Sequence, residues 1–151
     1  MKVIKIKLNG SDWLDPSTVK LMFTLTNTDG TNAMTILSGP HSFFRRYRLV
    51  CSGQIVEDID DYNRVHEMLT VLTSSAVRVN DAVEGARVWD GAGGSETLAA
   101  NAKRKFGMKL CSGLLNQTKM LPIRYAPLEI ELELVNQVGD AQQGSTSWNI
   151  S

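Results

Sequence analysis

The sequence is poor in the residues that build metal sites and disulfide frameworks. It contains only two cysteines and two histidines in 151 residues. Two cysteines cannot form a disulfide framework, and we expect Cys51 and Cys111 to be reduced residues that are in the core or half-buried. His41 and His66 stand in no metal-binding spacing, and neither cysteine has a recognisable catalytic base. We therefore expect no catalytic residue, no metal and no cofactor, and a protein that is not an enzyme.

An excess of charge of either sign is also missing. The 16 lysines and arginines are balanced by 16 aspartates and glutamates. A protein that works by coating nucleic acid needs a strong basic excess, so we expect no specific nucleic acid partner. The balance still leaves room for a local basic patch.

Long apolar runs are absent as well. No stretch approaches the roughly 20 uninterrupted apolar residues of a membrane-spanning helix, and so we expect no stable membrane insertion. The first ten residues alternate lysine with aliphatic residues and lack the apolar core of a secretory signal. We expect a protein that is not secreted through a signal peptide.

What the sequence does contain is a series of short alternating segments. In residues 128–134 leucines and Ile130 alternate with three glutamates, which is typical of a strand with two unlike faces. The same reasoning predicts further strands at 4–8, 19–26, 43–50, 55–56 and 105–110. Asp29-Gly30 is suited to a tight hairpin turn, and Ser52-Gly53 to another turn.

The spacing of the apolar residues changes once along the chain. Tyr62, Val65, Leu69 and Leu72 recur at spacings of three and four residues, which predicts a short α-helix at about 61–72. Asp60 or Asp61 is placed to cap its first turn. Strands joined by turns, one helix and no repeated strand-helix-strand unit predict an all-β protein, an antiparallel sandwich or barrel.

The domain organisation follows from the same pattern. We expect residues 1–140 to form a single domain. Residues 141–151 are polar up to Ser147 and then run into Trp148-Asn149-Ile150. We interpret them as a linker that runs into a new strand cut short.

Four segments could have functional roles. The acidic run at 57–61 matches no calcium-loop pattern and is better explained as a solvated turn with a helix cap, and Asp61, Arg64 and Glu67 suit a surface ion-pair ladder. Phe43–Arg48 mixes aromatics with arginines, as single-strand binders do, but we favour a subunit contact surface. Gly91–Ser95 lies in the irregular middle of the chain, and we expect an outer or inter-subunit loop there.

The order of the segments resembles the N-terminal jelly roll of double jelly-roll major capsid proteins of the Polinton-like virus, virophage and nucleocytoplasmic large DNA virus type. The resemblance lies in the stretches Ser11–Asp15 with Val19–Thr26, Phe43–Val50 with Gly53–Ile59, Tyr62–Arg64, and Leu121–Leu128 with the glutamate-rich strand. It implies that residues 1–140 form a single antiparallel jelly-roll β-sandwich and that residues 141–151 are a linker and the start of a second jelly roll that is missing. It also implies a structural protein of the virion that is assembled inside the host cell. Its implied partners are copies of itself, in trimeric pseudo-hexagonal capsomers of an icosahedral shell, and other capsid proteins such as penton or minor proteins. The alternative is a glycan- or receptor-binding β-sandwich module.

Overall fold

A computed structural model describes residues 2–74, 76–77 and 97–151 of the chain. The strands are β1 (Val3–Leu8), β2 (Lys20–Asn27), β3 (Met34–Ile36), β4 (Phe44–Cys51), β5 (Gln54–Ile59), β6 (Thr97–Leu98), β7 (Lys103–Lys109), β8 (Leu128–Leu134), β9 (Gln142–Gln143) and β10 (Trp148–Ile150). The helical elements are α1 (Tyr62–Val71) and the short 3-10 turns η1 (Pro16–Thr18), η2 (Pro40–Phe43) and η3 (Val138–Asp140).

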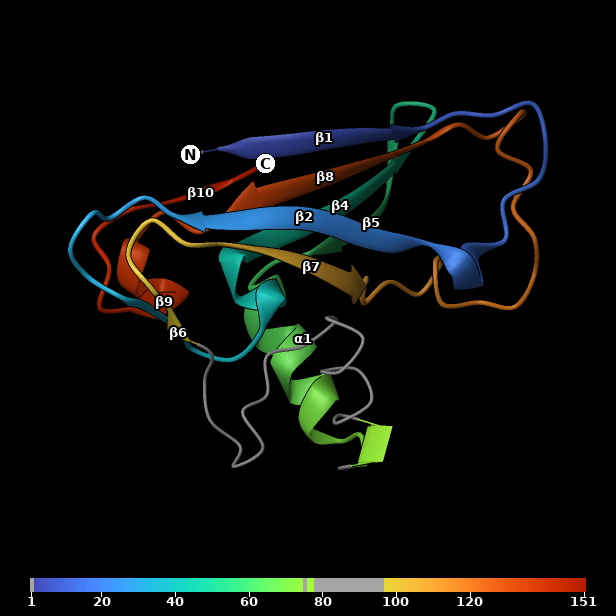
Figure 1. The fold of residues 1–151 in the computed structure, drawn as a ribbon. Helices are drawn as coiled ribbons and strands as arrows, with labels where there is room; N and C mark the ends of the chain where they lie inside the picture. Colours follow the sequence, from blue (N-terminus) through green and yellow to red (C-terminus); the bar gives the residue numbers. More distant parts are fainter. Residues whose placement is uncertain (1, 75, 78–96) are drawn as a thin grey trace.

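The strands form antiparallel sheets with the orders β1-β8-β4-β5, β10-β2-β7 and β6-β3-β9. Sheets β1-β8-β4-β5 and β10-β2-β7 lie one over the other, and α1 projects from one side of the pair (Figure 1). Neighbours such as β1 and β8 come from distant parts of the chain, so the connections cross between sheets as in a jelly roll. The predicted all-β sandwich with one helix is confirmed.

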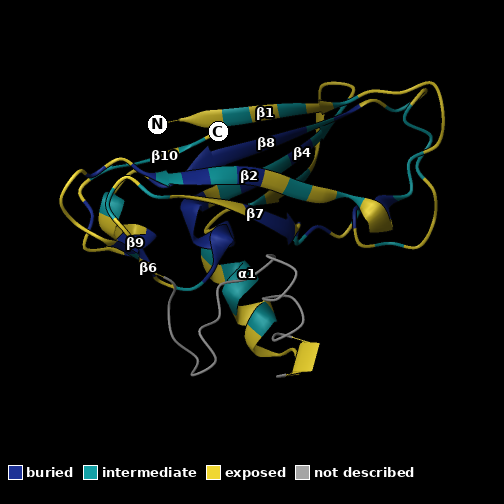
Figure 2. Ribbon diagram, viewed as in Figure 1, coloured by how far each residue is buried: buried dark blue, intermediate teal, exposed yellow. Residues whose placement is uncertain are grey.

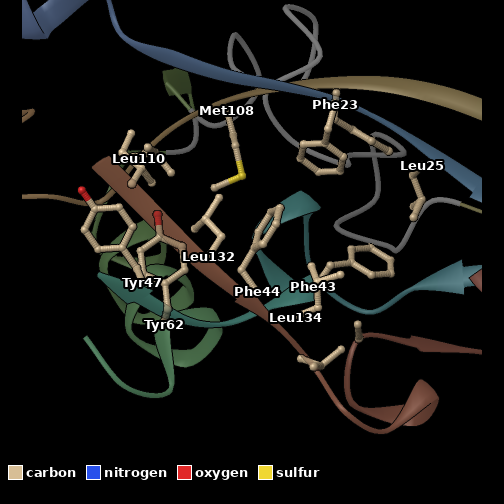
Figure 3. Close-up of a cluster of buried hydrophobic side chains, with 14 of the residues drawn as sticks. Phe23, Leu25, Phe43, Phe44, Tyr47, Tyr62, Met108, Leu110, Leu132 and Leu134 are labelled. Atoms are coloured by element: carbon tan, nitrogen blue, oxygen red, sulfur yellow. The ribbon is translucent and has the colours of Figure 1, made fainter. Parts of the chain in front are cut away.

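The core lies between sheet β1-β8-β4-β5 and sheet β10-β2-β7. Phe23 of β2 meets Phe44 of β4 edge to face at 5.4 Å and Phe106 of β7 at 5.8 Å between ring centroids. Figure 3 shows side chains from β2, β4, β7 and β8 pointing toward one another in this layer. Strand β8 is central and buried along most of its length (Figure 2), because its leucines and Ile130 face the core while its glutamates lie under neighbouring side chains.

Strands β4 and β5 form a hairpin whose turn is Ser52-Gly53, as predicted. Both residues have positive φ angles, 48° and 83°, which is the backbone of the turn that matches the right-handed twist of paired strands. The ladder shifts between Leu49, which faces Glu57, and Val50, which faces Ile55. Val56 therefore has no partner on β4, and β5, an edge strand, contains a β-bulge.

Helix α1 confirms the helix predicted at about 61–72. Asp61 occupies the N-cap position, but its side chain makes no capping hydrogen bond, so the predicted carboxylate cap is wrong. The reason is its left-handed backbone, with φ at 48°, since a capping side chain needs an extended backbone at this position. The backbone carbonyl of Asp61 still accepts bonds from the amides of Arg64 and Val65.

The predicted tight hairpin at Asp29-Gly30 is also wrong. Strand β2 pairs with β7 and β10 and not with β3, the strand that follows it. Gly30 does not have the positive φ angle that such a turn requires. The Asp29 carboxylate instead accepts bonds from the amides of Thr31 and Asn32, which shapes a wider loop.

Residues 141–151, interpreted from the sequence as a linker and the start of a second jelly roll, contribute strands to the described sheets. Strand β9 pairs with β3, and β10 pairs with β2. Trp148 packs edge to face against Phe43 with 4.9 Å between ring centroids. A second jelly roll stays a prediction.

Candidate functional site

The cavity between η2 and α1 is the first candidate for a site. It has a volume of about 510 Å³. Its wall is mixed in charge and is formed by Leu37, Ser38, His41, Ser42, Arg45, Asp61, Asn63, Arg64, Glu67, Met68, Val135 and Asp140. Such a wall has no net preference for a cationic or an anionic ligand.

Three polar side chains meet in this cavity. The Glu67 carboxylate bonds to His41 Nε2 at 3.1 Å and also accepts a bond from the Ser38 hydroxyl. A nucleophilic triad needs the imidazole next to the hydroxyl, with the carboxylate behind it. Here the carboxylate lies between the two, so the arrangement cannot deprotonate Ser38 in the manner of a hydrolase.

The two histidines contact each other. Their rings stack with centroids 4.3 Å apart, and His41 is almost fully buried. His66 lies on α1, and its contact with His41 joins the helix to η2. Among the described residues no group of three or more His, Cys, Asp or Glu side chains could hold a metal ion.

The segment Phe43–Arg48 divides between core and surface. Phe43, Phe44 and Tyr47 are buried, which leaves the arginines as the groups that a partner could contact. Arg46 holds Asp58 through two bonds of 2.8 and 2.7 Å, which lowers the pKa of Asp58 below its usual value. Arg45 is the most exposed of the three arginines, and its guanidinium lies 3.8 Å from Glu133.

Arg46 and Arg48 belong to a surface that we call the charge-balanced face, the outer side of sheet β1-β8-β4-β5. The register of the strands sets opposite charges next to each other on it. Glu131 bonds to Lys5 on one side and to Arg48 on the other, at 3.0 Å for Arg48. The face comprises Lys5, Lys7, Arg46, Arg48, Asp58, Glu129, Glu131 and Glu133.

The acidic run at 57–61 serves several separate purposes. Glu57 accepts bonds from the Ser112 hydroxyl at 2.5 Å and from the Leu114 amide at 2.6 Å, and so fixes the loop after β7. Asp58 pairs with Arg46, and Asp60 accepts a bond from the Asp61 amide. These carboxylates point to different partners. Glu57 and Asp58 lie in β5 and only Asp60 and Asp61 lie in a turn, so the interpretation of the whole run as a turn is wrong for its first part. The ion-pair ladder of Asp61, Arg64 and Glu67 stays a prediction.

Cys51 and Cys111 are both free and half-buried, as predicted. Burial raises the pKa of the Cys111 thiol, and the nearby Glu57 carboxylate raises it further. A raised pKa keeps the thiol protonated and therefore a poor nucleophile.

A buried polar cluster was missed by the sequence reasoning. Asn27 is fully buried, and its amide donates to the carbonyls of Asn32 and Ala99 while its oxygen accepts from Ser145. Asp29, nearby, accepts bonds from the amides of Thr31, Asn32 and Thr146, and these bonds hold its pKa far below the usual value. The cluster ties the 142–147 segment to the β2–β3 loop. Polar residues after an apolar strand were its only sequence signal.

Two further surfaces complete the survey. Trp13 and Tyr125 are 63% and 77% exposed and lie on two segments joined by a backbone bridge between Leu14 and Leu121. The predicted outer loop at Gly91–Ser95 lies outside the described residues. No described helix has the length and apolar character that a membrane crossing requires.

These sheets and connections define the class of fold, a jelly-roll β-sandwich of the type found in double jelly-roll major capsid proteins. Over 99% of its length the chain is similar to VP54 of PBCV-1, from a crystal structure fitted into a cryo-EM reconstruction of the virophage Sputnik, with a TM-score of 0.63 and 14% identity. It is similar over the same share to a chain of a quasi-atomic model of the PBCV-1 virus capsid, with a TM-score of 0.60 and 13% identity.

The chain spans 36% of the length of each of these two capsid chains. No protein-family model and no curated protein sequence matches it. At such low identity the likeness establishes the fold, and it confirms the jelly roll that the sequence resemblance predicts.

Proposed function

We propose that the chain is a structural, non-enzymatic jelly-roll domain of a viral capsid and that it works by contacting copies of itself. The observation that carries this proposal is the likeness of the whole chain to capsid chains at a TM-score of 0.63. The fold alone does not assign a function, and so the described surfaces must also suit the role.

The surfaces support an assembly role through the charge-balanced face. Each side chain of Glu131, Lys5 and Arg48 finds its counter-charge within the same sheet. A neighbour can cover these three side chains without leaving any of them unpaired, which would be costly. Arg45 lies beside the charge-balanced face. We assign to it the subunit contact that the sequence predicts for Phe43–Arg48.

The finer form of the proposal is a trimer. In it, the chain is one of two jelly rolls of a longer protein, three copies form a pseudo-hexagonal capsomer, and capsomers meet penton or minor proteins in an icosahedral shell of the virion. The length of the two capsid neighbours, of which the chain spans 36%, is compatible with a second domain.

Size-exclusion chromatography with light scattering tests the proposal on the natural full-length gene product. We expect the mass of a trimer or of a larger symmetric assembly, without any added metal or cofactor. We also expect Arg45→Glu to weaken association. The control Arg124→Glu makes the same change of charge at an exposed residue that is distant in sequence, and it should leave association intact. A product that stays monomeric at high concentration would rule out the assembly role.

A glycan- or receptor-binding module is the second candidate function. It is favoured by the exposure of Trp13 and Tyr125 on adjoining segments, because exposed aromatic side chains mark binding surfaces. This candidate predicts a glycan-array signal from a monomeric protein and its loss in Trp13→Ala. An assembling protein without such a signal excludes it.

A further inference from the structure

The outer side of sheet β10-β2-β7 carries a charge pattern unlike that of the charge-balanced face. Along β7, Lys103, Lys105 and Lys109 alternate with the buried Phe106 and Met108, so the lysines face outward. On the neighbouring strand Lys20 lies directly opposite Lys109. We call Lys103, Lys105 and Lys109 the basic face.

No acidic residue shares this surface within the described part of the chain. The register sets Met22 opposite Gly107, Thr24 opposite Lys105 and Thr26 opposite Lys103. The ion pairs of the described residues do not include Lys103, Lys105 or Lys109. Lys103 and Lys105 stand at alternate positions of one strand and repel each other, so the face would gain from a bound anion.

Two observations indicate which kind of anion fits. The glutamates of β8 are already engaged by Lys5, Arg45 and Arg48 of their own chain, so a second copy offers no row of free carboxylates there. Alternate residues of a strand advance by about 7 Å, which is close to the distance between successive phosphates along one strand of nucleic acid. The face also has no aromatic side chain on β2 or β7 with which bases could stack.

We propose that the basic face binds the phosphodiester backbone of nucleic acid without preference for sequence. Lysine acts there as a point charge that releases counterions from the phosphates. The neutral net charge of the chain limits the affinity of one copy, and binding strengthens when many copies present the face together. The inference does not rest on the proposed capsid role, because it uses only the charges of this sheet.

Fluorescence anisotropy with a labelled DNA duplex of about 30 base pairs tests the inference at salt concentrations between about 50 and 200 mM. We expect binding that weakens steeply with salt and is equal for unrelated sequences. The triple variant Lys103→Gln, Lys105→Gln, Lys109→Gln should bind about tenfold or more weakly. Its salt slope should fall by about 2.7, which is about 0.9 for each phosphate that the variant no longer neutralises.

The control variant Lys2→Gln, Lys7→Gln, Lys119→Gln removes the same number of exposed positive charges from other surfaces. It should bind as the parent does. Thermal melting checks that both variants fold, and the double variant Lys103→Gln, Lys105→Gln replaces the triple one if Lys109 proves necessary for folding. The inference would be overturned if the control lost as much DNA affinity as the triple variant, or if the parent did not bind DNA at low salt. It would also be overturned if polyglutamate competed for the protein as strongly as unlabelled DNA does.

Discussion

Tyr47 and Tyr62 stack with their ring centroids 5.4 Å apart, and this contact fastens the start of α1 to β4. The two rings are both fully buried, but their hydroxyl groups differ. That of Tyr62 accepts a bond of 2.9 Å from the Cys111 amide. That of Tyr47 has no hydrogen-bond partner within the described residues.

This difference predicts opposite outcomes for the same substitution. Tyr62→Phe should lower the free energy of unfolding by about 1 kcal/mol, because it leaves the buried Cys111 amide unsatisfied. Tyr47→Phe should leave it unchanged or raise it by up to about 1 kcal/mol, because it removes a buried group that has no partner. Urea unfolding followed by circular dichroism measures both, and each variant serves as the other's control. A greater loss in Tyr47→Phe would contradict the prediction.

Asp29 should make stability depend on pH in the acid range. Its pKa in the folded protein lies far below that of about 3.9 in an unfolded chain, because backbone amides donate to the carboxylate. The folded state thus gains stability that is fully present above about pH 4 and is lost as the pH falls further.

Asp29→Asn should therefore lower the urea midpoint at neutral pH and flatten its fall below about pH 4. Asp12→Asn is the matched control, since Asp12 is exposed and, among the described residues, bonds only to the adjacent Ser11. If the two variants showed the same pH profile, the Asp29 network would not be the source of the acid sensitivity.

Gly144 should tolerate no side chain. Its φ angle is 93°, and an added Cβ would lie 2.4 Å from the Ala33 carbonyl oxygen. Gly144→Ala should cost about 1 to 3 kcal/mol in the free energy of unfolding. Gly139→Ala meets no atom within 4 Å and should change stability by less than about 0.5 kcal/mol. Calorimetric melting of the pair checks the prediction, and equal melting temperatures would show that Gly144 is not constrained.

Arg48 and Glu131 should be energetically coupled across β4 and β8. A double-mutant cycle with Arg48→Gln and Glu131→Gln should give about 0.5 to 1 kcal/mol, and less in about 1 M salt. The same cycle with Lys7→Gln in place of Arg48→Gln should give a coupling near zero, because no ion pair joins Lys7 to the described residues. Coupling of equal size in the two cycles would mean that the charges act only at long range.

Elements with a strong local signal could be predicted from the sequence. The alternation of 128–134 and the helical spacing of Tyr62, Val65 and Leu69 are properties of neighbouring residues, and both elements formed where expected. The Ser52-Gly53 turn joins two strands that are adjacent in sequence, and so it too was visible.

Features that depend on pairing between distant segments could not be predicted. Lys20 and Lys109 each follow a recognisable pattern, but only the register of β2 with β7 sets them opposite each other. Asp29-Gly30 has the composition of a hairpin turn. The predicted hairpin is wrong because β2 pairs with β7 and β10, and because the amide of the distant Thr146 donates to Asp29. The stacking of His41 on His66 arises in the same way.

The bulge at Val56 limits how copies of the chain can meet. A straight outer strand would offer its free amides and carbonyls to the next molecule, and that molecule to another, in a fibre without end. Because Val56 bends the ladder at this border, the border is a poor template for such growth. For the assembly that we propose, this border therefore favours contacts through the broad sides of the sandwich, where rotational symmetry can close a ring of finite size.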